Sequence, residues 1–237
     1  MKGAEKMNGD NRVLPILFNT DMVRAILEEE PYNKTATRRK INGFIPDDAI
    51  WGYTAFAPRD YRSCRGTFAD GYGEKFFRLP YLEGDILYVR ETFRPLSDHP
   101  AAGFEYAADW SAKYFANSKR SNCCNHGKWI PSIHMPKRAA RIWLKVKDVS
   151  VERLHNMTLK DFLAEGITVR PETLNDPENA YQQAKNRFIA IWDSTIPKEE
   201  QAIYSWDANP WVWVIEFEQC EKPEACTGNE NREEKEI

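Results

Sequence analysis

The densest group of residues able to do chemistry is the sequence K-T-A-T-R-R at residues 34–39. A lysine amine beside threonine hydroxyls can act as a general base or activate a nucleophile if burial lowers its pKa. Lys34 and Thr37 are therefore candidate catalytic residues. Arg38 and Arg39 could instead contact phosphate, and a short basic run is also common on an ordinary solvated surface.

A second candidate is Glu91, at the end of the apolar segment 86–93. Alternation along a strand places Leu87, Val89 and Glu91 on one face. If that face is the core side, Glu91 lies at its inner rim, and burying the carboxylate alone would cost several kcal/mol. The cations that could pair with it are Lys34, Arg39 and Arg141. Such a pair could be catalytic or simply structural.

A third pattern combines cations with an indole. One face of the strand expected at 140–154 carries Arg141, Trp143, Lys145 and Lys147. These side chains could contact phosphate and stack on a base, or they could simply form the solvated face of the strand. His134 lies between two prolines in a loop that is therefore restricted in conformation. The full set of candidate nucleic-acid contacts is Arg38, Arg39, Arg90, Trp129, His134, Arg138, Arg141 and Trp143, with Lys34 and Lys137 as further phosphate contacts.

Metal and cofactor chemistry have little support. Cys123, Cys124 and His126 have too few partners at zinc-ligand spacing. The sequence has no phosphate-binding glycine loop, no H-E-x-x-H and no G-x-S-x-G. We therefore predict neither a metal nor a cofactor.

The composition indicates a globular protein. Of 237 residues, 42% are hydrophobic and 29% charged, and the net charge is -3. The whole of this negative net charge lies in the acidic segment 219–237, so the net charge of residues 1–218 is zero. Only a local basic patch could therefore bind nucleic acid. No apolar run approaches the roughly 18 residues of a membrane span. Five cysteines, an odd number, and an N-terminus unlike a signal peptide predict a cytoplasmic protein.

The hydropathy pattern predicts an α+β fold, a small mixed barrel with peripheral helices. Strands are expected at 13–19, 86–93, 104–108, 140–154 and 211–218, and helices after residue 20 and at 158–166 and 177–194. Residues 1–12 and 219–237 should be flexible tails around a domain at 13–218. Two long insertions interrupt it, an irregular one at about 43–83 and another at about 95–128.

Several segments together resemble the ASCH domain family. These are K-T-x-T-R-R at 34–39, G-D-x-L-x-V-R-E at 84–91, W-x-P-S-I-H-M-P at 129–136 and the W-D-A-N-P-W segment from 206. The whole of 13–218 looks like the larger ASCH-type proteins of bacteriophages and prophages. The resemblance implies a β-barrel similar to the PUA domain of RNA-modifying enzymes.

The resemblance implies two functions. Most members are regarded as binders of RNA or other nucleic acid, in a cleft beside the barrel. One small bacterial branch hydrolyses N4-acetylcytidine with a lysine, a threonine and a glutamate. The first two align with Lys34 and Thr37, whereas the glutamate position holds Lys145, so Glu91 would have to replace it.

The sequence therefore leaves three hypotheses. The first is a module that binds RNA or a modified base, with Trp129 or Trp143 stacking. The alternative is an amidohydrolase acting on an acylated nucleoside, with Lys34 as general base. A third is a protein acting only through protein contacts, for which the tryptophan-rich segment 206–213 would be the interface.

Overall fold

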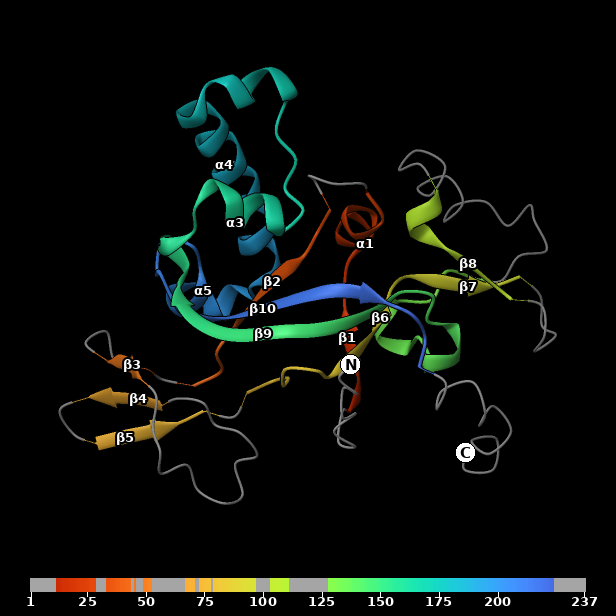
Figure 1. Ribbon diagram of the computed structural model, residues 1–237, viewed down its shortest axis with the longest axis horizontal. Helices are drawn as coiled ribbons and strands as arrows, with labels where there is room; N and C mark the ends of the chain where they lie inside the picture. Colours follow the sequence, from red (N-terminus) through yellow and green to blue (C-terminus); the bar gives the residue numbers. More distant parts are fainter. Residues whose placement is uncertain are drawn as a thin grey trace, which may run out of the picture. The chain divides into compact units, whose positions relative to one another are not determined.

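The computed structural model describes residues 12–28, 33–43, 45, 49–52, 67–70, 73–77, 79–96, 103–110 and 128–223. The chain divides into two compact units built from interleaved segments. The first unit combines Met1–Leu27, Gly84–Lys145 and Glu218–Ile237, and the second combines Glu28–Glu83 and Val146–Phe217. The fold is of the α+β class, as predicted (Figure 1).

The largest sheet has five strands in the order β1-β6-β9-β10-β2. Their bounds are β1 Val13–Leu17, β6 Ile86–Arg90, β9 Trp143–Arg153, β10 Trp211–Cys220 and β2 Ala36–Lys40. β1 is parallel to β6, whereas β6 with β9 and β10 with β2 are antiparallel. Within the described residues no pairing joins β1 to β2, so the sheet is open where a closed barrel was expected.

In the first unit, β1 leads into helix α1 (Thr20–Leu27). The Asn19 side chain accepts a hydrogen bond from Met22 N at 2.8 Å, which caps the helix start as its polar sequence predicts. Val23 and Ile26 form the buried face of α1. After β6 comes a two-stranded hairpin, β7 (Phe93–Pro95) and β8 (Phe104–Tyr106), which confirms the short strand expected at 104–108.

The segments that follow this hairpin in the first unit are short 3₁₀ helices. They are η1 (Ala107–Asp109), η2 (Ser132–His134) and η3 (Lys137–Ala139). Each of η2 and η3 follows directly on a proline, Pro131 or Pro136, whose ring fixes the backbone before the turn. The proline pair thus sets the course of the loop that carries His134.

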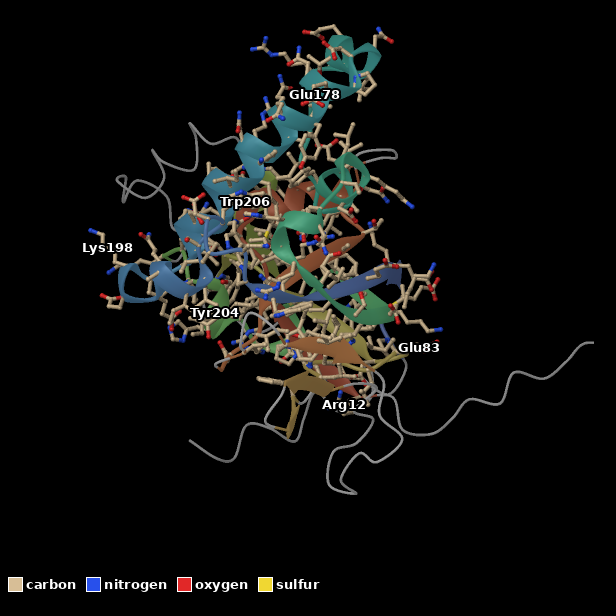
Figure 2. All side chains as sticks on the ribbon, turned by 90° about the vertical axis from the view of Figure 1, so that its left-hand side faces the viewer. Arg12, Glu83, Glu178, Lys198, Tyr204 and Trp206 are labelled. Carbon is tan, nitrogen blue, oxygen red and sulfur yellow. The ribbon has the colours of Figure 1, made fainter. Side chains whose placement is uncertain are left out.

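The second unit holds most of the helical structure, η4 (Leu154–Asn156), α3 (Leu159–Ala164), η5 (Pro171–Asn175), α4 (Pro177–Thr195), η6 (Lys198–Glu200) and α5 (Gln201–Tyr204). Helix α3 starts with a capping box, because Thr158 and Asp161 exchange side-chain to backbone hydrogen bonds. Helix α4 begins at Pro177 behind the capping side chain of Asp176, and Glu178, labelled in Figure 2, lies in its first turn.

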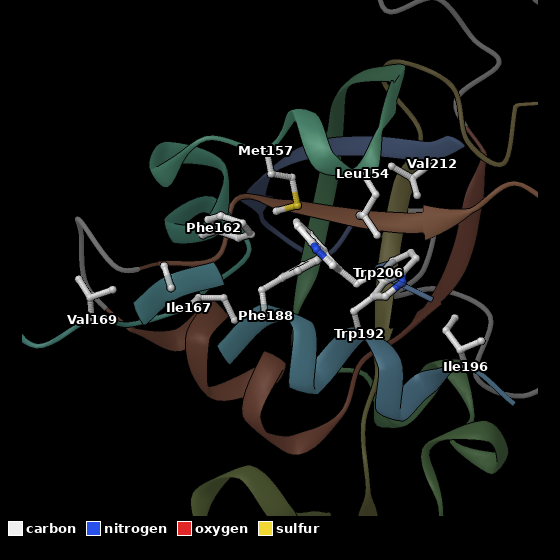
Figure 3. Packing of buried hydrophobic residues seen from close by; sticks show 11 residues of the cluster. Leu154, Met157, Phe162, Ile167, Val169, Phe188, Trp192, Ile196, Trp206 and Val212 are labelled. Carbon is white, nitrogen blue, oxygen red and sulfur yellow. The ribbon is translucent and has the colours of Figure 1, made fainter. Parts of the chain in front are cut away.

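The core of the second unit is rich in aromatic side chains. Phe188 and Trp192 point from α4 toward Phe162 and Trp206, as Figure 3 shows. The rings of Phe162 and Phe188 lie 5.4 Å apart, and those of Phe188 and Trp206 6.0 Å apart. Phe188 and Trp192 are four residues apart, so they lie on one face of α4, and that face is buried.

The segment 43–83, expected to be irregular, contains a three-stranded antiparallel sheet in the second unit. Its strands are β3 (Ile50–Gly52), β4 (Thr67–Asp70) and β5 (Gly73–Phe76). Strands of three or four residues are too short to show a convincing alternation, which is why sequence periodicity misses them. No helix in the described part of the chain is long and apolar enough to cross a membrane.

Candidate functional site

In the first unit, the segment 128–141 packs against the β7–β8 hairpin. Phe93 and Ile130 exchange two backbone hydrogen bonds, at 3.2 and 2.7 Å. Met135 is 1% exposed and clusters with Phe93 and Ala139. The backbone N–H of Glu91 donates to Met135 Sδ at 3.1 Å. This apolar anchor fixes the segment that carries four of the predicted nucleic-acid contacts, Trp129, His134, Arg138 and Arg141.

A fifth predicted contact, Arg90, supports the same loop. Its guanidinium donates a hydrogen bond to the carbonyl oxygen of Ile133. Ile133, His134, Lys137 and Arg138 are exposed. The loop thus presents two cations and a histidine from a backbone that is restrained by prolines, the buried Met135 and Arg90.

Arginine–aromatic contacts gather on the hairpin. The Arg94 guanidinium lies 4.9 Å from the ring centre of Trp110 and 4.5 Å from that of Trp129. The two indoles meet edge to face at 5.8 Å. Arg94 is itself buried and pairs with Glu105 at 2.6 Å. Neither Arg94 nor Trp110 was predicted, since nothing in the sequence indicates that residues 94, 110 and 129 meet.

Two further arginines lie over aromatic rings of the hairpin. Arg138 is 5.9 Å from the ring centre of Phe104, and Arg141 is 4.1 Å from that of Tyr106. Tyr106 also donates its hydroxyl to Ala139 O at 2.8 Å. We call this set the arginine–aromatic cluster. It consists of Arg94, Phe104, Tyr106, Trp110, Trp129, Arg138 and Arg141.

Glu91 has the cationic partner that its position requires. Its carboxylate, 1% exposed, accepts from Arg141 Nε at 2.8 Å and from Arg141 Nη2 at 3.1 Å. Burial raises the pKa of Glu91 above its usual value, with Arg141 opposing the rise. Asp109 binds the remaining side of the guanidinium at 2.8 Å. Of the three partners considered from the sequence, Arg141 is the one found.

Other predicted contacts are buried. Trp143 is 4% exposed, with its ring 6.1 Å from that of Tyr88, so it does not present the stacking surface that we expected. Lys145 and Lys147 are exposed as strand alternation predicts, whereas Trp143, the first residue of the strand, is covered, and Arg141 lies outside the strand. Trp206 and Trp213, in the segment considered as a protein interface, are each 5% exposed and belong to the interior.

In the second unit, Lys34 lies at the centre of a buried ionic network. Its Nζ donates to Glu165 Oε2 at 2.6 Å, to Ala36 O at 2.8 Å and to Glu165 O at 2.9 Å. Its side chain is 0% exposed. Burial lowers the pKa of Lys34, and the Glu165 carboxylate opposes that shift.

Arg38 extends this network to three carboxylates. It bonds Glu152 on β9 at 2.6 Å, Asp161 on α3 at 3.1 Å and Glu165 at 3.4 Å. With a side chain 1% exposed, Arg38 is not placed to contact phosphate as we expected. Burial lowers the pKa of its half-buried neighbour Arg39, with Glu165 opposing. The K-T-A-T-R-R motif therefore serves mainly an internal ionic network.

Thr37 differs from its charged neighbours. It is 1% exposed, and its hydroxyl oxygen has no hydrogen-bond partner among the described residues. Leaving a buried hydroxyl without a hydrogen-bond partner costs free energy of folding. No hydrogen bond joins Thr37 to Lys34, although the two lie in one short segment.

The described residues contain no group of three or more histidine, cysteine or acidic side chains able to hold a metal ion. Comparisons of the chain with protein-family models, with curated proteins and with solved structures found no match.

Proposed function

We propose that this chain is an ASCH-type protein with a PUA-like ancestry that binds nucleic acid, RNA or a modified base, through the arginine–aromatic cluster. Bacteriophages and prophages are the expected source. Two of the motifs that carry the resemblance, at 84–91 and 129–136, lie together in the first unit. They are joined by the Arg90–Ile133 and Glu91–Met135 hydrogen bonds, which supports the proposal.

The observation that carries the proposal is the combination of ring stacking with nearby exposed charge. Proteins bind single-stranded nucleic acid by stacking bases on aromatic and guanidinium planes while cations contact the backbone. Here Phe104, Tyr106, Trp110 and Trp129 are all half-buried, so each exposes part of its surface. Lys137 and Arg138 are exposed on the adjacent 3₁₀ helix.

The charges of the cluster limit how much phosphate contact can contribute. Arg94 is neutralised by Glu105, and Arg141 by Glu91 and Asp109. Among the described residues near the loop, Lys128, Lys137 and Arg138 make no ion pair, and they are the available phosphate contacts. We therefore expect binding of modest affinity in which stacking contributes substantially.

Fluorescence anisotropy of a labelled single-stranded RNA, titrated with the protein at low salt, tests the proposal. Lys137→Ala combined with Arg138→Ala should weaken binding about tenfold, because each removes a cation next to the cluster. The matched control is Lys198→Ala combined with Arg187→Ala, which removes two exposed cations from the second unit and should leave the affinity unchanged. Equal affinities for the two double variants would contradict the proposal.

A second candidate function is hydrolysis of an acylated nucleoside such as N4-acetylcytidine. The specific observation in its favour is Glu165, which supplies a carboxylate beside Lys34 although the glutamate position of the resemblance holds Lys145. In that reaction, Lys34 must first lose one of the three protons with which its Nζ donates hydrogen bonds here. It then takes the proton of the water that attacks the amide carbon, and the acyl group leaves as the free carboxylic acid. The proton then passes to the departing amine, and Glu165 stabilises the ammonium form of Lys34 between these steps.

Chromatography of N4-acetylcytidine incubated with the protein tests the second candidate. Cytidine should form with the unmodified chain and not with Lys34→Ala or Glu165→Gln. Lys40→Ala is the matched control, because Lys40 is the last residue of β2 and also pairs with a glutamate, Glu200. Turnover that survives both Lys34→Ala and Glu165→Gln, or no turnover by the folded protein, would remove this candidate.

A further inference from the structure

We propose that Arg141 is a stacking platform for an unpaired nucleobase, and that it does not bind phosphate. This inference rests on the proposed nucleic-acid function and specifies its ligand as a single strand with accessible base faces. The sequence predicts that Arg141 contacts phosphate, whereas here it contacts a base.

Three of the five N–H groups of the Arg141 guanidinium already have partners. Nε and Nη2 donate to the two oxygens of Glu91, and Nη1 donates to Asp109 at 2.9 Å. A phosphate bound by an arginine needs the same N–H groups in the guanidinium plane. To bind a phosphate through Nε and Nη2 together, Arg141 would have to release Glu91, leaving a carboxylate that is 1% exposed without its cation. The N–H groups left on Nη1 and Nη2 lie next to the Asp109 carboxylate, which disfavours an anion there.

The charges around Arg141 disfavour a phosphate. Glu91, Asp109 and Arg141 together carry a net charge of -1 when both acids are ionised. A phosphate approaching this triad would meet repulsion from two carboxylates. A neutral base ring meets no such repulsion, so the electrostatics favour a base over a phosphate at this position.

The Arg141 guanidinium is packed on an aromatic ring. One face lies over the ring of Tyr106, 4.1 Å from its centre. The edges are taken by Glu91 and Asp109, yet the side chain keeps 27% of its surface exposed. We infer that this exposed surface includes the face directed away from Tyr106, which is where a base would stack. A guanidinium with one face on an aromatic ring and its edges fixed by carboxylates is a rigid plane on which a base can stack.

The neighbouring residues extend the platform. Arg138 lies over Phe104, the cross-strand neighbour of Pro95 on the same hairpin. Trp129 and Trp110 are held by the buried Arg94. A single strand can place successive bases on such planes, whereas a duplex keeps its base faces stacked inside the helix. The ligand of this cluster is therefore an unpaired stretch.

The test measures the affinity of the protein for a short single-stranded RNA and for the same RNA carrying abasic nucleotides. Both affinities are measured by fluorescence anisotropy over a series of salt concentrations. The unmodified protein should bind the abasic RNA about tenfold more weakly, since each stacked base contributes to affinity. Arg141→Ala should lose about tenfold on the natural RNA, lose little on the abasic RNA, and keep the same salt dependence.

Removing Arg141 alone could unfold the first unit, because Glu91 would lose its cation. The variant Glu91→Gln with Arg141→Gln leaves a neutral pair able to hydrogen bond and lacks the guanidinium, so it serves as the second test. Arg153→Ala is the matched control. It removes another arginine that lies over an indole, Trp211 at 4.6 Å, from the second unit.

The outcomes separate the two proposals. If the unmodified protein binds neither RNA, the nucleic-acid function fails. If it binds both RNAs equally, the function stands and the stacking inference fails. If the Arg141 variants lower the salt dependence by about 0.7 in the log–log slope, Arg141 is a phosphate contact and the inference is overturned. A loss of affinity in Arg153→Ala equal to that in Arg141→Ala would also overturn it.

Discussion

At the scale of single residues, burial decides which sequence predictions the structure confirms. Glu91 could be predicted to need a cation, because strand alternation placed it with Leu87 and Val89, and Arg141 is that cation. The Arg94–Trp110–Trp129 contacts could not be predicted, since they depend on a hairpin that joins positions distant in sequence.

Lys34 provides a prediction about stability at this scale. Lys34→Met leaves the Glu165 carboxylate buried with a weaker set of cationic partners, so we expect the free energy of unfolding to fall by about 3 kcal/mol. Urea denaturation at pH 7 measures this. Lys34→Met combined with Glu165→Leu removes both charges and should recover most of the loss. A single variant as stable as the unmodified chain would show that the ion pair contributes nothing.

The same residue predicts a pH dependence. Because the folded-state pKa of Lys34 is lowered, the unfolded chain binds more protons than the folded chain between that value and the ordinary 10.5. The free energy of unfolding contributed by Lys34 should therefore rise with pH across this window. Denaturation at several alkaline pH values checks this rise against Lys34→Met, in which it should be absent. Parallel curves for the two proteins would contradict the prediction.

At the scale of elements, long periodic segments are predictable and short ones are not. The stripe of Phe188 and Trp192 identifies α4, and Thr158 with Asp161 identifies the start of α3. The strands β3, β4 and β5 could not be predicted because they are only three or four residues long. Their stability depends on pairing with one another, which no single segment of the sequence reveals.

The start of α3 gives a prediction at this scale. Thr158→Ala removes the side chain that accepts from Asp161 N and donates to its carboxylate, so unfolding should become easier by about 1 kcal/mol. Lys160→Ala, an exposed change in the same helix, is the control and should have little effect. Chemical denaturation of both variants measures the difference, and equal stabilities would show that the capping box is unimportant.

The loop at 131–136 gives a second prediction for an element. Met135→Ala leaves a cavity beside Phe93 and Ala139, so we expect a loss of about 2–4 kcal/mol. Met135→Leu keeps nearly the same volume and should lose less than about 1.5 kcal/mol. If the loop positions Lys137 and Arg138, the alanine variant should also bind RNA more weakly at temperatures where it remains folded. An unchanged affinity would mean that the anchor does not shape the interface.

At the scale of the whole molecule, the sequence supports the α+β class but not the division of the chain. The segments of the two units alternate along the chain, and β9 and β10 each contain residues of both units. The amino-acid composition does not change at these boundaries, so the division could not be predicted from it. The candidate contacts divide in the same way. Arg90, Trp129, His134, Arg138 and Arg141 belong to the first unit, and Lys34, Thr37, Arg38 and Arg39 to the second.

The salt dependence of RNA binding tests the central claim most directly. With Lys128, Lys137 and Arg138 as the available cations, the log of the association constant should fall against log salt with a slope of about -2 for a single strand. Lys137→Ala combined with Arg138→Ala should make that slope shallower by about 1.4. No measurable binding at low salt, or a slope that the double variant leaves unchanged, would contradict nucleic-acid binding at the arginine–aromatic cluster.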